Sequence, residues 1–91
     1  MKKFTVIWQH KVLPRLTDIY VTARQQGRDT AAITRAVAQI DSLLETNPGS
    51  QGESRSRYER ILIVSPLTVK FEVYDDERVA LISSVRYRRG R

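Results

Sequence analysis

Arginine, lysine and tyrosine residues gather in the second half of this 91-residue sequence. The chain closes in SSVRYRRGR, where one tyrosine stands among four arginines, and its last thirteen residues contain no Asp or Glu. A guanidinium binds phosphate through two parallel hydrogen bonds and stacks on bases, while tyrosine offers a stacking surface or a phenol for proton transfer. The pattern predicts a surface that binds a polyanion or an acidic protein. The alternative is a solvated basic tail.

The candidate residues fall into two groups. Lys70, Arg86 and Tyr87 have the types needed at a reaction centre. The expected polyanion contacts are basic residues that lead into one strand-like segment or end another: Arg55, Arg57, Arg60, Arg88, Arg89 and Arg91. If these strands pair as neighbours, the side chains can converge on the sheet face opposite the helices.

Cleavage of RNA without a metal is one reaction that these residue types allow. The 2′-OH attacks the adjacent phosphate, so a protein must orient it, assist proton transfer and stabilise the added charge. Arg and Lys can supply the charge stabilisation. A tyrosine, or a lysine with a lowered pKa, can supply some of the proton transfer.

Other familiar chemistries lack their residues. The sequence has no cysteine and one histidine, His10, which excludes disulfides and thiolate metal sites and argues against a Ser-His-Asp triad. The segment GSQGES lacks the lysine and the strand-to-helix context of a phosphate-binding loop. We therefore expect no metal and no cofactor.

The overall charge favours polyanionic partners. Sixteen Lys and Arg against ten Asp and Glu give a net charge of +6 and a pI near 10.2. No apolar run approaches the roughly 20 residues of a membrane span, and the apolar stretch near the N-terminus is too short for a signal peptide. These features predict a cytoplasmic protein with no membrane partner, folded as one domain over residues 1–91.

Two helices are predicted in the first half of the chain. From about residue 11 the apolar residues recur with a helical period, and Pro14 should lie in the first turn. Gly27 breaks this helix, and Asp29 is expected to cap a second helix that stops at residues 47–49. Because the connection is short, the helices should form an antiparallel hairpin.

Four strands complete the prediction. The segment KFTVIW alternates near the N-terminus, and after the Gly/Ser/Pro-rich loop 47–54 come strands at 58–64, 67–74 and 78–87. In the middle one, Val69, Phe71 and Val73 should face the core, with Thr68, Lys70, Glu72 and Tyr74 on the opposite side. The predicted fold is therefore α+β, in the order β-α-α-β-β-β, with the helical hairpin on one face of a mostly antiparallel four-stranded sheet.

This ordered set of segments resembles the RelE/ParE family of bacterial type II toxins. The resemblance covers nearly the whole chain. It is carried by VIW, by the helices up to LLETNPG, and by GESRSRYERILIV, LTVKFEVYDD and RVALISSVRYRR. The stretches VKFEVYDD and VRYRR are the most similar to the family in spacing.

The resemblance implies a toxin neutralised by a small cognate antitoxin, here expected to be acidic. RelE-like members cleave mRNA on the ribosome and so inhibit translation. By this resemblance Arg60 and Lys70 would hold the phosphate, Arg86 would stabilise charge, and Tyr87 would stack on a base or assist proton transfer. Thr68 stands where RNA-cleaving members often place a phosphate-binding arginine, and Lys70, two residues on, could replace that arginine.

Two other functions stay open. ParE-like members poison DNA gyrase, which would make gyrase the partner in place of mRNA and ribosome. A degenerate member would only bind its antitoxin.

Overall fold

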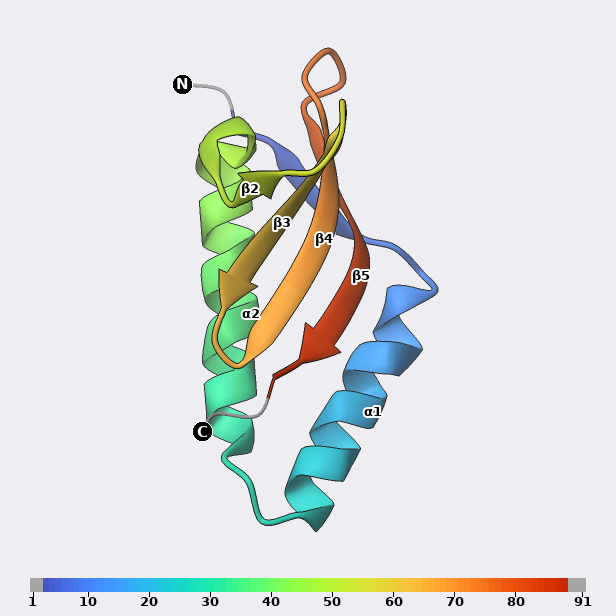
Figure 1. The fold of residues 1–91 in the computed structure, drawn as a ribbon, viewed down its shortest axis with the longest axis vertical. Coiled ribbons are helices and arrows are strands. Elements are labelled where there is room, and N and C mark those ends of the chain that lie inside the picture. Colours follow the sequence, from blue (N-terminus) through green and yellow to red (C-terminus); the bar gives the residue numbers. More distant parts are fainter. Residues whose placement is uncertain (1–2, 89–91) are drawn as a thin grey trace.

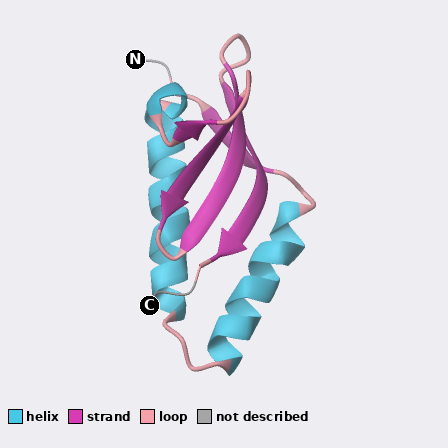
Figure 2. Cartoon of the chain, in the orientation of Figure 1, coloured by secondary structure: helices cyan, strands magenta, loops and turns pink. Residues whose placement is uncertain are grey.

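Two helices cover one face of a five-stranded sheet in the computed structural model, which describes residues 3–88 (Figure 1, Figure 2). The elements follow in the order β1 (Thr5–Trp8), α1 (Val12–Gln25), α2 (Thr30–Thr46), the 3₁₀ turn η1 (Pro48–Ser50), β2 (Glu53–Ser54), β3 (Glu59–Val64), β4 (Leu67–Tyr74) and β5 (Val79–Tyr87).

The sheet has the strand order β1-β5-β4-β3-β2. β1 runs parallel to β5, as a strand joined through a helical crossover can, and the other neighbours are antiparallel. The predicted α+β class and mostly antiparallel sheet are confirmed. The predicted number of four strands is wrong by one, because the two residues of β2 also pair with β3 and are too few to show an alternating pattern.

The helix signals in the sequence lie where they were expected. Pro14 lies in the first turn of α1, where its missing N–H costs no hydrogen bond. Gly27 has a φ of +69° between the helices. Asp29 caps α2, and its Oδ1 accepts hydrogen bonds from the backbone N–H groups of Ala31 at 3.0 Å and Ala32 at 3.3 Å. The two helices meet at one end and splay apart, with α1 beside β5 and α2 behind the sheet (Figure 1).

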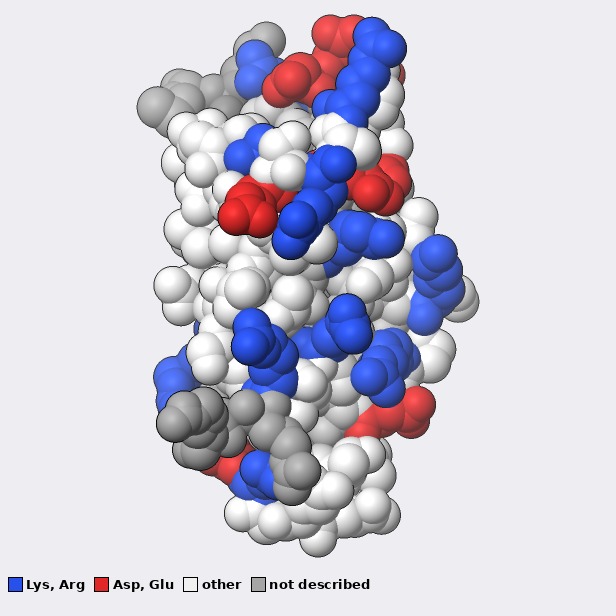
Figure 3. Space-filling view, viewed as in Figure 1, with Lys and Arg blue, Asp and Glu red and all other residues white. Residues whose placement is uncertain are grey.

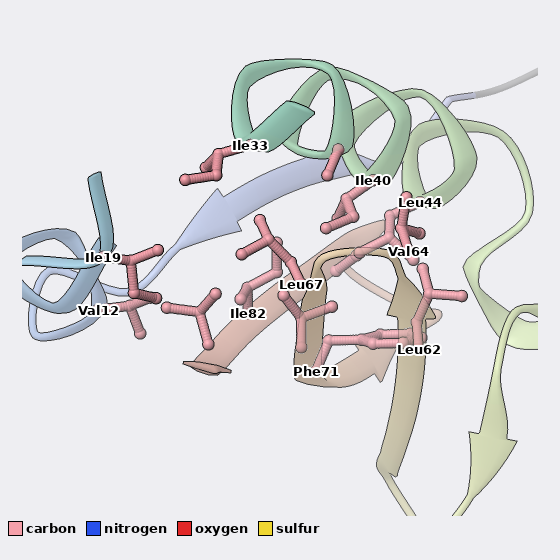
Figure 4. Packing of buried hydrophobic residues seen from close by; sticks show 14 of the residues in the cluster. Val12, Ile19, Ile33, Ile40, Leu44, Leu62, Val64, Leu67, Phe71 and Ile82 are labelled. Carbon is pink, nitrogen blue, oxygen red and sulfur yellow. The ribbon is translucent and has the colours of Figure 1, made fainter. Parts of the chain in front are cut away.

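The core lies between the helices and the sheet (Figure 4). Ile33, Ile40 and Leu44 of α2 are fully buried, as are Phe71 of β4 and Ile82 of β5. Their period in α2 is helical and their period in the strands is two, so each element presents one apolar side. This packing fixes which side of each strand faces away from the helices.

We call that other side of the sheet the open face. On β4 it carries Thr68, Lys70, Glu72 and Tyr74, as the alternation predicts. On β5 a bulge changes the alternation: Lys70 pairs with Ser84 but Phe71 pairs with Ile82, leaving an extra residue between them. The side chains of β5 therefore exchange faces at the bulge.

Candidate functional site

Lys70 and Arg86 lie on the open face, on adjacent strands. Arg86 is directly opposite Thr68, and Lys70 is directly opposite Ser84. In an antiparallel pair, opposite residues share a face, so the two cations are diagonal neighbours. Figure 3, drawn from the same side as Figure 1, shows lysine and arginine side chains over this side of the molecule. Lys70 and Arg86 thus share the face opposite the helices, where the sequence placed them.

Carboxylates accompany Lys70 on the same face. Its Nζ is 3.8 Å from Oε2 of Glu59, which lies on β3 opposite Glu72. The Tyr74 hydroxyl donates a hydrogen bond to Oε1 of Glu72. That hydrogen bond, with burial and the negative charge of Glu72 as further causes, raises the pKa of Tyr74 above its ordinary value of 10.0. The face thus combines cations with carboxylates that can accept protons.

Thr68 has a hydroxyl that is enclosed near Arg86. Its Oγ1 is buried and has no hydrogen-bond partner within residues 3–88. A buried hydroxyl without a partner costs free energy, so a water molecule or a ligand that hydrogen-bonds to Oγ1 would be favoured. Thr68 adds a polar atom to the open face, although it does not supply the charge of an arginine.

Tyr87 does not share this face, so its expected position beside Arg86 and Lys70 is wrong. It is paired with Leu67 of the core side and packs beneath α1, where it lines a hollow of about 270 Å³ with Ile19 and Ala23. The cause is the bulge in β5. Without it, Tyr87 would follow the alternation of Val79 and Leu81 onto the open face.

Arg60 also faces the helix side, contrary to the expectation. It is opposite Phe71, a core residue. Its Nε donates to the carbonyl of Gln51 at 2.7 Å and its Nη2 to the carbonyl of Gly52 at 3.1 Å. Arg60 therefore holds the chain that enters β2, and two of its donor groups are already used.

The remaining basic candidates are dispersed. Arg55 is exposed and 3.4 Å from Glu53, and the guanidinium carbon of exposed Arg57 lies 5.6 Å from the ring centre of Tyr58. Arg88 is exposed just after β5, and its backbone N–H donates to the carbonyl of Pro66. Arg89 and Arg91 lie outside the described residues.

Sequence reasoning missed the aromatic pair at the end of the sheet nearest the β4–β5 turn. The rings of Tyr58 and Tyr74 are stacked, with centroids 5.8 Å apart and an angle of 22° between their planes. The alternation of LTVKFEVY already placed Tyr74 on the open face. Its contact with Tyr58 depends on how β3 pairs with β4, which no local pattern reveals.

Two features are absent from the part of the chain that the structure describes. Within residues 3–88, no three His, Cys, Asp or Glu side chains are grouped closely enough to hold a metal ion. Neither helix is long and apolar enough to cross a membrane.

Comparison with known proteins supports the fold. The sequence matches no protein-family model, and no curated protein matches it. The structure is similar to a chain in the crystal structure of the toxin–antitoxin complex RelBE2 from Mycobacterium tuberculosis, with a TM-score of 0.66. The match covers 97% of this chain and 94% of that chain at 14% sequence identity. The chain has a RelE-like fold.

Proposed function

We propose that this protein is the toxin of a toxin–antitoxin pair, with a small antitoxin as its partner. The support is the similarity of almost the whole chain to one from a toxin–antitoxin complex. The net charge of +6 favours an acidic antitoxin, because opposite charges speed association.

In this proposal the toxin cleaves mRNA on the ribosome through its open face. The observation that carries it is the placement of Lys70 and Arg86 on neighbouring strands of that face. Lys70 binds the scissile phosphate and Arg86 stabilises the charge that develops on it. Glu59, next to Lys70, takes the proton from the 2′-OH, whose oxygen attacks the phosphorus to form a 2′,3′-cyclic phosphate. The bond from phosphorus to the 5′-oxygen breaks, and that oxygen takes a proton from water, because Tyr87 lies on the other side of the sheet.

Gyrase inhibition is the second candidate. Two features favour it: a threonine at position 68, where the resemblance would place an arginine, and the packing of Tyr87 beneath α1. A protein that binds gyrase needs neither a phosphate-binding arginine nor a proton donor on the open face.

The test is to express the chain from a tightly repressed promoter and map mRNA 5′ ends after induction. We expect new cuts at regular positions within codons. Lys70→Ala and Arg86→Ala should remove them, whereas Arg24→Ala, which deletes an exposed arginine on α1, should not. Tyr87→Phe should also retain cleavage, because its hydroxyl is not on the open face.

Other results would contradict the proposal in distinct ways. Growth arrest with intact mRNA would favour gyrase as the target. The absence of arrest would leave a protein that only binds its antitoxin. Loss of cleavage in Tyr87→Phe, with the fold intact, would move the reaction centre to the α1 side of the sheet.

A further inference from the structure

A concave site separate from Lys70 and Arg86 lies at the end of the sheet, beside the turn that joins β4 to β5. It encloses about 760 Å³. Its walls come from the loop before β3, with Tyr58 and Arg57, and from the end of β4, with Tyr74. The turn residues Asp75 and Asp76 form part of its rim.

Planar side chains dominate one wall of this hollow, which we call the Tyr58–Tyr74 pocket. Tyr58 stacks on Tyr74, and the guanidinium of Arg57 lies over the Tyr58 ring. Tyr58 remains 51% exposed, which is high for a large aromatic side chain. Stacked aromatic and guanidinium groups of this kind bind the flat faces of nucleobases.

The polar groups of the pocket can distinguish one nucleobase from another. Arg60 is held by the carbonyls of Gln51 and Gly52, so it forms a fixed part of the lining. The carboxylates of Asp75 and Asp76 can only accept hydrogen bonds when ionised. A base with an exocyclic amine can donate to them, as cytosine does through N4, whereas uracil presents a carbonyl oxygen at that position.

We propose that the Tyr58–Tyr74 pocket binds one unpaired, amine-bearing nucleobase of single-stranded RNA. In this arrangement the base replaces the guanidinium of Arg57 on the Tyr58 ring, opposite Tyr74, and the displaced Arg57 contacts the phosphate. The carboxylates of the turn accept the amine hydrogens of the base. The role of the pocket in a longer RNA rests on the proposed function. Tyr74 is four residues from Lys70 on the same side of β4, roughly 13 Å along the strand, so one RNA strand can reach both sites.

The first test uses single nucleotides, so it does not depend on cleavage. Cytidine and uridine 5′-monophosphate are titrated separately into the protein while the tyrosine ring resonances are followed by NMR. Cytidine monophosphate should shift the resonances of Tyr58 and bind about fivefold more tightly than uridine monophosphate, the ratio that one additional hydrogen bond gives. Asp75→Asn/Asp76→Asn should remove this difference. Unshifted Tyr58 resonances, or equal affinities for the two nucleotides, would overturn the proposal.

The second test uses labelled oligocytidine and oligouridine of about ten nucleotides, a typical length for a small single-strand site. By fluorescence anisotropy, Tyr58→Ala should weaken oligocytidine binding about tenfold, while Tyr58→Phe retains it. Lys70→Ala should weaken binding of both oligonucleotides. The single tryptophan, Trp8, reports whether each variant is folded.

The two proposals fail in different ways. If Lys70→Ala weakens both oligonucleotides but Tyr58→Ala changes neither, the base pocket is wrong and the proposed function stands. If induction produces no new mRNA 5′ ends while cytidine monophosphate still shifts Tyr58, RNA cleavage is wrong and the nucleotide site stands.

Discussion

Replacing Gly52 with alanine tests how closely the chain before β2 approaches β3. Gly52 has a φ of +69°, in the left-handed region that costs most residues about 1 kcal/mol or more. A Cβ at this position would lie 2.1 Å from the carbonyl oxygen of Ile61 and 2.8 Å from its carbonyl carbon. The backbone would therefore have to move away from β3 by more than an ångström.

That movement has an energetic cost that can be estimated. The guanidinium of Arg60 donates to the carbonyls of Gln51 and Gly52, and displacement of the chain would break both hydrogen bonds. Each contributes about 1 kcal/mol. Together with the backbone term, Gly52→Ala should lower the free energy of unfolding by about 3 kcal/mol. The free energy of unfolding should fall by no more than this, because β2 is short and exposed and can separate from β3 without opening the core.

Gly27→Ala provides a matched control. Gly27 has the same φ of +69°, but nothing lies within 4 Å of a Cβ placed there. This variant should lose only the backbone term, about 1 kcal/mol. The difference between the two variants therefore measures the close approach to β3.

Urea denaturation followed by Trp8 fluorescence is a suitable assay. Trp8 Nε1 donates to Asp41 Oδ1 at 2.8 Å, so the indole reports the contact between β1 and α2. With a slope of about 1 kcal/mol per molar urea, the midpoint should fall by about 3 M in Gly52→Ala and about 1 M in Gly27→Ala. Equal midpoints for the two variants would refute the reasoning.

Two other predictions concern a helix cap and a phenol. Asp29→Ala removes the acceptor for the first N–H groups of α2 and should lower the free energy of unfolding by about 1 kcal/mol. Asp29→Asn should retain most of the stabilisation by the cap, and thermal unfolding of both variants would measure the difference. Glu72→Gln should lower the pKa of Tyr74 back toward 10.0, because the hydrogen bond to the Glu72 carboxylate and the charge of that carboxylate raise this pKa. An absorbance titration with Tyr74→Phe as the reference would measure the change. Since the folded protein holds the phenol proton more tightly than the unfolded chain, this contribution to stability is present below about pH 10 and is lost as pH rises through the raised pKa. A pKa of Tyr74 unaltered by Glu72→Gln would contradict this assignment of the cause.

Local patterns in the sequence were sufficient to predict the main helices and strands and the fold class. The helical period, Asp29 as a cap and Gly27 as a break are properties of neighbouring residues, so they can be recognised without knowing the tertiary contacts. The alternation of β4 likewise placed Lys70 on the open face. The pairing of β4 with β5, which follows from the short turn between them, was also predictable, but it does not decide the face of Arg86.

The tertiary structure alone decided which side of the sheet the residues near strand ends occupy. Side chains in a strand alternate with a period of two, so one bulged residue transfers every later side chain to the other face. In β5 that shift places Arg86 on the open face and Tyr87 beneath α1. Pairing with β4 likewise directs Arg60 to the helix side and joins Tyr58 to Tyr74. Strand register and a bulge depend on contacts between distant segments, and for this reason the composition of the candidate site was not predictable from local sequence.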